Sequence, residues 1–302
     1  RASLRIGKQK GPIGLERQQS GGAIELVERG LATELAPNRD LGVALYGELA
    51  ASTINYTVGV FNGTADGREV SAADDGLKEI EGRVFFEPFK NDYGVFKGFG
   101  FGVAGSTGAK DGSGNNLIAR YRSPGQNQFF TYDGTGVVAS GQHTRYAPQA
   151  YFYRNNLGVL AEYTVSEQDL RRGGVERSIK NEAYNVTASY VLTGEDASYK
   201  GIKPATPYSI GGEGWGAVEL VARIGGLDVD NAAFAGVAGT DRLADPSKQA
   251  SKAERYGLGV NWVLTQNAKL TADYNFTRFE GGNGATDRRD EKAVFTRLTI
   301  QY

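Results

Sequence analysis

Residue types that carry out enzymatic chemistry are scarce in this sequence. The chain of 302 residues has no cysteine and no methionine, and His143 is its only histidine. Disulfides within the chain, thiolate metal sites and any site with two imidazoles are therefore excluded. A Ser–His nucleophile would depend on His143, which ends a long polar segment and has no acid–base partner nearby in the sequence. We expect His143 to be a solvated loop residue, and we expect no catalysis, no cofactor and no metal.

One short motif imitates a nucleotide site. Residues 100–105 read Gly-Phe-Gly-Val-Ala-Gly and match the G-x-G-x-x-G pattern. That pattern needs a helix directly after it, because the helix N-terminus binds the phosphate. Here no helical periodicity follows, and the aromatic residues lie at strand spacing. Residues 97–106 are therefore predicted to be a strand, and no nucleic-acid partner is expected.

Apolar residues recur at every second position in many segments, which is typical of strands with two different faces. In the segment 268–277 the residues of one predicted face are Leu270, Ala272, Tyr274 and Phe276, and those of the other are Lys269, Thr271, Asp273 and Asn275. Leu258, Val260 and Trp262 continue the apolar face in the segment before it. A soluble β-sandwich alternates in the same way, so the alternation alone leaves both architectures open.

The lengths of the connections favour a barrel. Twelve strands are predicted, near 2–10, 40–50, 54–62, 78–88, 97–106, 144–154, 157–168, 180–193, 215–226, 253–264, 268–279 and 291–302. Short connections (51–53, 89–96, 155–156, 265–267) alternate along the chain with long ones (11–39, 63–77, 107–143, 227–252, 280–290). Two connections depart from this rule: 169–179 is moderate, and 194–214 is too long for a turn. Outer-membrane barrels sort their loops in this way, whereas a sandwich has no reason to.

Other features agree with an outer-membrane location. No segment approaches the roughly 18–20 apolar residues of a membrane-spanning helix. The 43 glycines are about twice the ordinary share of roughly 7%. The last predicted strand ends on an aromatic residue, Tyr302, which resembles the terminal strand of outer-membrane proteins. This ending places the C-terminus and the short turns on the periplasmic side. The chain opens directly as a strand, without a visible signal peptide.

If the apolar face meets lipid, the alternate residues face a water-filled lumen. The basic residues expected to line the pore are Arg5, Arg83, Arg145, Arg223, Arg255, Lys269 and Arg297. The acids expected on the same face are Glu48, Glu79, Glu81, Glu87, Glu162, Glu219 and Asp273. The two signs balance, so any ion selectivity must come from a few charges clustered at a constriction.

Two long connections are candidates for that constriction. The segment 107–143 is expected to fold into the lumen, since Gly98, Gly100, Gly102 and Ala104 of the preceding strand leave room for it. The segment 11–39 mixes glycine, leucine and charge, and is expected to pack on the wall or inside the lumen. Its basic residues Arg17, Arg29 and Arg39 are candidate ion contacts, unless they pair with the neighbouring acids Glu16, Glu25 and Glu28.

The sequence resembles the phosphate-selective porins of the O and P type from Gram-negative bacteria. The resemblance covers essentially the whole chain and is carried by the stretches GPIGLERQQS…ELVERGLATELAPNRDLGVALYGEL (11–49), YRSPGQNQFFTY (121–132), YAPQAYFYRNNLGVLAEY (146–163), ASYVLTGEDASYKGIKP (188–204) and GVNWVLTQNAKLTADYNFTRF (259–279). It implies a transmembrane antiparallel β-barrel of 16 strands, a homotrimer and a third loop folded into the lumen. It also implies that 194–214 is a long periplasmic connection.

The resemblance also implies functional residues. Phosphate-specific members draw anions along a ladder of arginines and hold them at a constriction made by a lysine, serines and an arginine. Mapped on the G-L-E…V-E-R spacing, these positions are Arg17, Ser20 and Arg29, with Gly21 where a second serine is expected. The inserted loop offers Lys110, Arg120 and Arg122 rather than a run of arginines, which departs from the phosphate-specific pattern.

We therefore expect residues 1–302 to be a single all-β outer-membrane barrel domain that lacks the first strands of the family fold; a complete twelve-stranded barrel is the alternative. The expected function is passive diffusion of small hydrophilic solutes with a bias toward anions such as phosphate. Arg17, Ser20, Arg29, Arg120 and Arg122 are the predicted anion contacts. A general non-selective porin, or a barrel that serves as a structural or adhesion surface, is the alternative. Membrane lipid, lipopolysaccharide and small anions are the expected partners.

Overall fold

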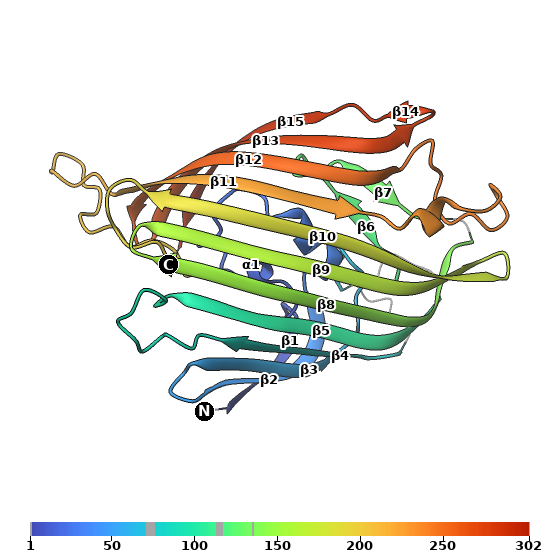
Figure 1. Cartoon of the computed structure of the whole chain (residues 1–302), viewed down its shortest axis with the longest axis horizontal. Coiled ribbons are helices and arrows are strands. Elements are labelled where there is room, and N and C mark those ends of the chain that lie inside the picture. The colour runs from blue at the N-terminus through green and yellow to red at the C-terminus, as the bar shows by residue number, and fades with distance from the viewer. Residues whose placement is uncertain (1, 71–75, 113–116, 135, 302) are drawn as a thin grey trace.

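A single curved antiparallel sheet organises the chain (Figure 1). The structure is a computed structural model that describes residues 2–70, 76–112, 117–134 and 136–301. The long strands are β1 (Ala2–Gln9), β2 (Asp40–Leu49), β3 (Ile54–Phe61), β4 (Glu79–Phe86), β5 (Phe99–Gly112), β8 (Val138–Arg154), β9 (Leu157–Arg172), β10 (Val175–Val191), β11 (Ala217–Asp228), β12 (Ala250–Thr265), β13 (Ala268–Asn283) and β15 (Glu291–Ile300). All twelve predicted strands are confirmed.

Each long strand pairs antiparallel with the next long strand along the chain. The short strand β14 (Thr286–Asp287) pairs with β13, and β6 (Arg120–Arg122) and β7 (Gln128–Thr131) form a separate hairpin. Within the described part of the chain, β1 pairs only with β2 and β15 pairs only with β13 and not with β1, so the sheet has two edges.

Several strands extend further than their apolar pattern predicts; β5, for example, continues to Gly112 and β13 to Asn283. β9 continues to Arg172 and β10 begins at Val175, although a loop was expected over 169–179. Gly173 and Gly174 alone form the turn, both with positive φ (57° and 81°), as a tight turn between twisted strands requires. β8 likewise begins at Val138. The backbone pairing continues here beyond the apolar band, where the side chains are charged and the alternation is lost.

The two faces of the sheet differ as the period of two predicts. On the convex face, Leu258 is 64% exposed and Val260 43% exposed, with no second sheet covering them in the described residues. On the concave face, Asn261, Thr271 and Asn275 are fully buried. The apolar face is therefore the outer one, and the β-sandwich alternative is wrong.

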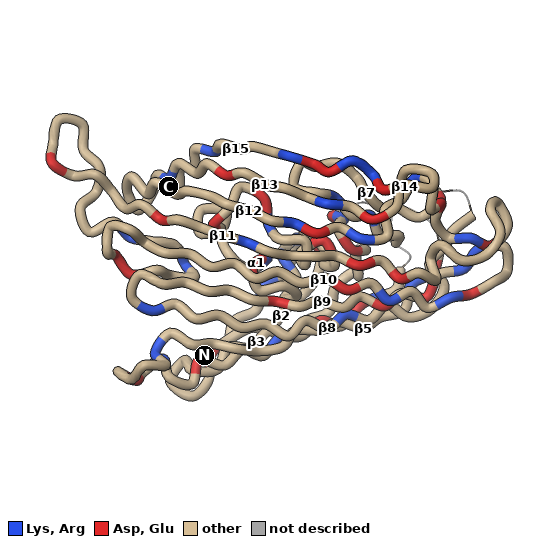
Figure 2. Tube along the Cα trace, turned by 45° about the horizontal axis from the view of Figure 1, so that its top comes forward, with Lys and Arg blue, Asp and Glu red and all other residues tan. Residues whose placement is uncertain are grey.

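The connections separate by length between the two ends of the sheet, except for the long connection 192–216 and the two-residue turn 173–174 (Figure 1). The turns at 50–53, 87–98, 155–156 and 266–267 lie at one end, together with the long connection 192–216. The other end holds the longer connections, including the 3-10 helix η2 (Asn231–Phe234). Charged residues are denser toward this second end (Figure 2). None of the helices in the described part of the chain is long and apolar enough to cross a membrane.

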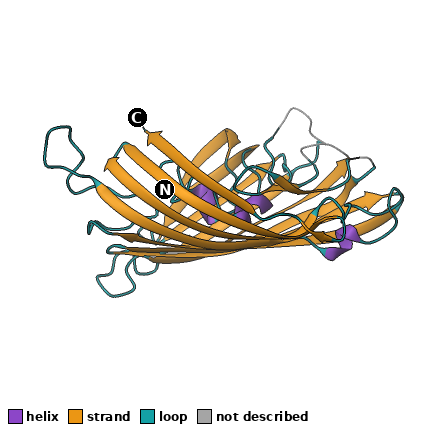
Figure 3. Ribbon diagram, turned by 90° about the horizontal axis from the view of Figure 1, so that it is seen from above, coloured by secondary structure: helices purple, strands orange, loops and turns teal. Residues whose placement is uncertain are grey.

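Two segments fill the concave side of the sheet (Figure 3). The first is residues 10–39, called here the first inserted segment, which contains α1 (Leu15–Gln18) and η1 (Leu31–Leu35). The second is residues 117–132, called here the inserted hairpin, which contains β6 and β7. Of the segment 107–143, which was predicted to fold into the lumen, residues 117–132 lie on the concave side, whereas 107–112 belong to β5 and 138–143 to β8. Residues 113–116 and 135, and also Tyr302, lie outside the described residues.

Candidate pore constriction

The first inserted segment is held by polar side chains of the wall that accept from its backbone. Glu162 on β9 accepts hydrogen bonds from the N–H groups of Leu15 (2.6 Å) and Glu16 (3.4 Å). Asp273 on β13 accepts from the N–H of Val27 (2.6 Å). A buried backbone N–H without a partner costs free energy, so these side chains fix the path of a segment that lacks regular secondary structure.

Basic residues of the wall bind the carbonyl oxygens of the same segment. Lys269 donates to Ile24 (2.7 Å) and Arg297 to Val27 (3.0 Å). Arg223 and Arg255 both donate to the carbonyl oxygen of Glu28, at 3.0 and 3.1 Å, and Arg255 also donates to that of Arg29. Four of the basic residues predicted on the lumen face therefore lie there, and each donates at least one hydrogen bond to the inserted backbone.

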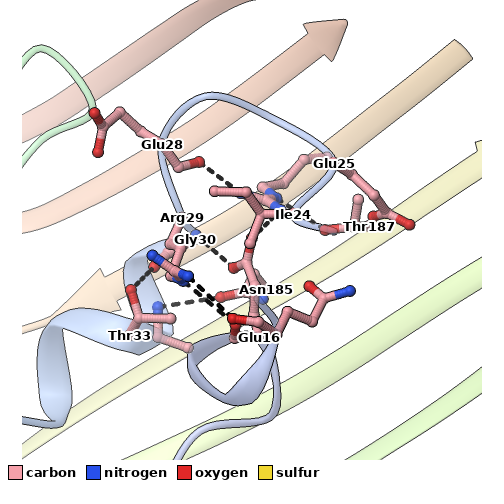
Figure 4. Close-up of polar contacts among 12 residues, drawn as sticks. Glu16, Ile24, Glu25, Glu28, Arg29, Gly30, Thr33, Asn185 and Thr187 are labelled. Carbon is pink, nitrogen blue, oxygen red and sulfur yellow. Dashed lines mark hydrogen bonds and ion pairs between the residues drawn. The ribbon is translucent and has the colours of Figure 1, made fainter. Parts of the chain in front are cut away.

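Glu16 is a buried centre of this network (Figure 4). Its carboxylate lies 2.5 Å from the guanidinium of Arg223, and both side chains are 1% exposed. The same carboxylate accepts from the N–H of Gly30 at 2.7 Å. The carbonyl oxygen of Glu16 accepts from Nε of Arg29 at 3.3 Å. Glu16 therefore joins α1, the turn before η1 and the wall, and it places Arg29 within the segment.

The inserted hairpin is fixed by aromatic packing. Tyr121, Phe129 and Phe130 are fully buried in one cluster with residues of η1 and of the concave face of β10 to β13. The rings of Tyr121 and Phe130 stack with centroids 5.5 Å apart, and Phe129 contacts Phe279 of β13 at 5.6 Å. This apolar cluster fixes the hairpin near the long-connection end.

The two inserted segments meet at a cavity of about 190 Å³. Three of the predicted anion contacts line it: Arg17 and Arg29 from the first inserted segment and Arg122 from the hairpin. Two carboxylates, Glu28 and Glu34, line it as well. Residues far apart in the sequence thus come together, as the prediction of a constriction requires.

Arg17 is the most deeply buried of the three arginines. It donates to the side-chain oxygen of Asn38 and to the carbonyl oxygen of Thr33, while its Nε is buried and has no hydrogen-bond partner in the described residues. Burial lowers the pKa of Arg17 to about 10, and neighbouring Glu34 opposes this shift. Arg17 therefore stays charged at neutral pH and keeps one N–H group unsatisfied.

Lys10 is a cation that the sequence analysis missed. It follows β1 directly, and its Nζ donates to the carbonyl oxygen of Gln19 at 2.7 Å. Arg29 donates to the same oxygen at 3.3 Å. Burial, followed by the charges of Arg29 and Arg17, lowers the pKa of Lys10 to about 8. Its position at the first residue of the inserted segment is the signal that could have identified it.

A second group of cations lies toward the long-connection end. Arg68 donates from Nε to the carbonyl oxygen of Ile118 at 3.2 Å. Its pKa falls to about 10, chiefly through burial and then through the charges of Arg120 and Arg122. Within the described residues, none of the cations Lys10, Arg17, Arg29, Arg68, Arg120 and Arg122 forms an ion pair with a carboxylate.

Other candidate residues lie elsewhere. Ser20 is exposed, does not line the cavity, and its Oγ accepts from the N–H of Ala23. Arg39 is also exposed and outside the cavity. Arg5 stacks over the ring of Tyr46 and Arg83 over that of Phe85, with distances of 4.7 and 4.5 Å to the ring centroids.

Two expectations near β8 are wrong. His143 is fully buried within the strand, where it shares a 2.9 Å hydrogen bond with Ser166 and contacts Arg145, so it is not a solvated loop residue. Lys110 belongs to β5 rather than to a loop, and it pairs with Glu79 in a buried contact of 3.4 Å. Arg145 is itself buried between Glu79 and Asp66.

The room beside the small residues of β5 is taken differently from the prediction. Ile13 and Ala36 of the first inserted segment pack against Ala104, together with Ala147 of β8. A Cβ at Gly100 would lie 2.6 Å from the ring of Phe85. The small residues thus accommodate the first inserted segment and a wall aromatic, rather than the loop 107–143.

An apolar outer face, a polar inner face and inserted segments that carry the free cations define the class of outer-membrane porins. The chain belongs to the phosphate-selective porin O and P family, whose model matches residues 1–302. This membership confirms the expectations of an outer-membrane location and of a protein that is not an enzyme. No curated protein sequence matches the chain.

Two solved structures are similar in fold. The outer-membrane expressed OmpT of Vibrio cholerae has 9% sequence identity and a TM-score of 0.51, over 99% of this chain and 77% of that protein. A porin refined at 1.8 Å has 11% identity and a TM-score of 0.45, over 87% of this chain. The matched region spans 62% of that porin's length.

Proposed function

We propose that this chain forms the wall and the constriction of a water-filled outer-membrane pore, through which small hydrophilic solutes diffuse passively with a preference for anions over cations. The observation that carries the proposal is the set of inserted cations without carboxylate partners. Several acids of the wall are bound elsewhere: Glu79 by Arg145, and Glu162 and Asp273 by backbone N–H groups of the first inserted segment. On the inserted segments, Lys10, Arg17, Arg29, Arg120 and Arg122 form no ion pair in the described residues, and neither does Arg68 in the connection between β3 and β4.

The proposed mechanism is electrodiffusion between weak sites. Arg68, Arg120 and Arg122 form the first group of cations from the long-connection end, and Arg17, Arg29 and Lys10 form the second. Guanidinium groups compensate an anion for part of its lost hydration through charge-assisted hydrogen bonds. Several weak sites in succession let the ion leave again, which conduction requires.

The assembly belongs to the same proposal. Residues 1–302 act as one barrel domain, and its two sheet edges, which are open at β1 and β15 in the described residues, must be closed in the membrane. Unpaired backbone groups in hydrocarbon cost several kcal/mol each, so open edges are not stable there. Lipid and lipopolysaccharide surround the apolar face, and the resemblance to the family supports a homotrimer.

The test is the reversal potential of the purified protein in a planar bilayer under a KCl gradient. We expect chloride preference in the wild type. Arg122→Glu should weaken or reverse that preference, because the Arg122 side chain lines the cavity. The substitution should not disturb folding, because this side chain makes no hydrogen bond or ion pair in the described residues. Lys248→Glu makes the same charge change at an exposed loop residue (74% exposed side chain) and should leave the potential unchanged. Cation preference in the wild type would overturn the anion bias.

A general porin without ion preference is the second candidate. The observation in its favour is that Glu28 and Glu34 line the same cavity as the three arginines. A reversal potential near zero in the same recording, with normal conductance, would establish it. Absence of conductance would instead support a structural or adhesion role.

A further inference from the structure

The two carboxylates that line the cavity form no ion pair with the guanidinium groups of its arginines in the described residues. Glu34 accepts from the backbone N–H of Arg122 at 3.0 Å through Oε2. Glu28 accepts from Nε2 of Gln126 at 3.0 Å, also through Oε2. In the described residues Oε1 of each has no hydrogen-bond partner, and neither carboxylate forms an ion pair. The cavity therefore presents free acceptors as well as free donors.

The donors of the same cavity are also incompletely used. The side chain of Arg122 has no hydrogen bond or ion pair in the described residues, and Nε of Arg17 is buried without a partner. Arg29 uses two of its N–H groups on the carbonyl oxygens of Glu16 and Gln19. Nε of Arg17 is closed to a solute by its burial, so the unused donors that line the cavity are those of Arg122, beside the two glutamates.

These charges are unfavourable for a small multivalent anion. Three guanidinium groups face two carboxylates, so the net local charge is about +1 when all are ionised. A phosphate dianion is repelled by the negative charges of the two carboxylates. It also carries mostly acceptor oxygens, so it cannot donate hydrogen bonds to both carboxylates. A site with buried hydrogen-bonding groups discriminates strongly against solutes that cannot pair with them. The carboxylates thus act as the repulsive element that specificity needs.

From this arrangement we infer that the cavity selects hydroxylated organic monoanions, such as sugar acids, over inorganic phosphate. One carboxylate of such a solute pairs with Arg17, Arg29 or Arg122, and its hydroxyl groups donate to Glu28 and Glu34. The two glutamates are the residues that determine specificity. The inference rests on the proposed anion-conducting function and names the solute class of the same site.

The experiment measures how gluconate and inorganic phosphate reduce the chloride current through single channels of the full chain. In the wild type we expect gluconate to act at a concentration about tenfold lower than phosphate, a ratio that corresponds to about 1.4 kcal/mol at 25 °C. In Glu28→Gln and Glu34→Gln the ratio of the phosphate concentration to the gluconate concentration that reduces the current equally should fall toward one. The reason is that each substitution removes a negative charge that repels phosphate. Glu69→Gln, at an exposed surface ion pair with Lys8, is the matched control and should keep the wild-type ratio.

A second comparison uses the wild type alone and does not depend on the folding of any variant. Lactate and propionate differ by one hydroxyl group, and lactate should reduce the current at the lower concentration. The inference is overturned if phosphate acts at least as strongly as gluconate on the wild-type channel, if lactate and propionate act equally, or if the folded glutamine variants keep the wild-type ratio. Those results leave the chloride preference in a KCl gradient intact, so they are distinct from a failure of the proposed function.

Discussion

Glu16 of the first inserted segment and Arg223 of β11 form an ion pair of 2.5 Å that is closed to solvent, since each side chain is 1% exposed. The pair connects a segment without regular structure to the rigid wall. Arg223 also donates to the carbonyl oxygen of Glu28 and to Oγ1 of Thr187 (2.8 Å), so one guanidinium fixes two points of the segment to the wall. The position of the candidate constriction depends on this contact.

Arg223→Met should loosen the first inserted segment, because it leaves the Glu16 carboxylate buried without its partner. Loss of one partner of a buried ion pair costs about 3–5 kcal/mol. We expect a larger single-channel conductance, more current noise and a weaker chloride preference. Glu69→Gln removes an exposed pair with Lys8 and serves as the control, since such pairs contribute only about 0–1 kcal/mol. Unchanged conductance in Arg223→Met would contradict this role.

The chloride preference should fall as the pH rises from 6 to 9. Burial, followed by neighbouring Glu219, raises the pKa of Glu25 to about 7, so Glu25 gains its negative charge near neutral pH. Burial and two arginines lower the pKa of Lys10 to about 8, so Lys10 loses its positive charge above that pH. Both changes make the inserted segment less positive with rising pH.

Reversal potentials recorded across that pH range measure this effect. Glu25→Gln should remove the change near pH 7, and Lys10→Gln should remove the change near pH 8, with the other step preserved in each variant. Glu213→Gln, in the exposed connection 192–216, is the control for a general charge effect. A preference that rises with pH would show that other groups control the pore.

Much of the fold follows from the sequence because lipid and lumen impose opposite demands on alternate residues. Leu258 and Asn261 illustrate both demands, and every long strand was found from this pattern. The ends of the strands were not found from this pattern. At the turn of Gly173 and Gly174, for example, the side chains next to the turn are charged on both faces. His143 was misplaced for a related reason: its burial depends on Ser166 of the next strand, which the local sequence does not reveal.

The candidate site was predictable only in part. Arg17, Arg29 and Arg122 were predicted as anion contacts, and the structure brings them to one cavity, while their contact with an anion stays a prediction. The arrangement of Arg255 and Lys269 could not be foreseen, because their partners are backbone carbonyl oxygens, whose positions depend on the path of residues 24–29. Glu28 was predicted only as a possible partner of neighbouring arginines, and Glu34 was not named, because their place in the cavity depends on the path of the inserted segments.

Gly30→Ala should displace the inserted segment. A Cβ at Gly30 would lie 2.2 Å from Oδ1 of Asn185, which is fully buried and accepts from the N–H of Ala32 at 3.2 Å. We expect a loss of about 1–3 kcal/mol in stability, as for other overpacked positions, measured by urea unfolding in detergent. Gly21→Ala is the matched control on the same segment, because its Cβ would meet open space. Equal unfolding midpoints for the two variants would refute the packing argument.

Glu291→Ala should release the tip of the inserted hairpin. Glu291, at the start of β15, accepts hydrogen bonds from Oγ of Ser123 (2.7 Å), from the N–H of Gly125 (2.9 Å) and from Nδ2 of Asn127 (2.6 Å). Arg122 directly precedes these residues, so its place at the cavity depends on the same tip. Hydrogen bonds to a charged group contribute roughly 1.5–3 kcal/mol each, and their joint loss should leave the aromatic base of the hairpin packed while its tip moves.

The measurable consequence is a selective loss at Arg122. In Glu291→Ala the chloride preference should fall toward that of Arg122→Gln, and adding Arg122→Gln to Glu291→Ala should change it little further, because both substitutions remove the same guanidinium from the cavity. Asp290→Asn is the control, since this exposed neighbour makes no contact in the described residues. Fully additive effects of the two substitutions would mean that Glu291 acts on the pore through its own charge and not by positioning the hairpin.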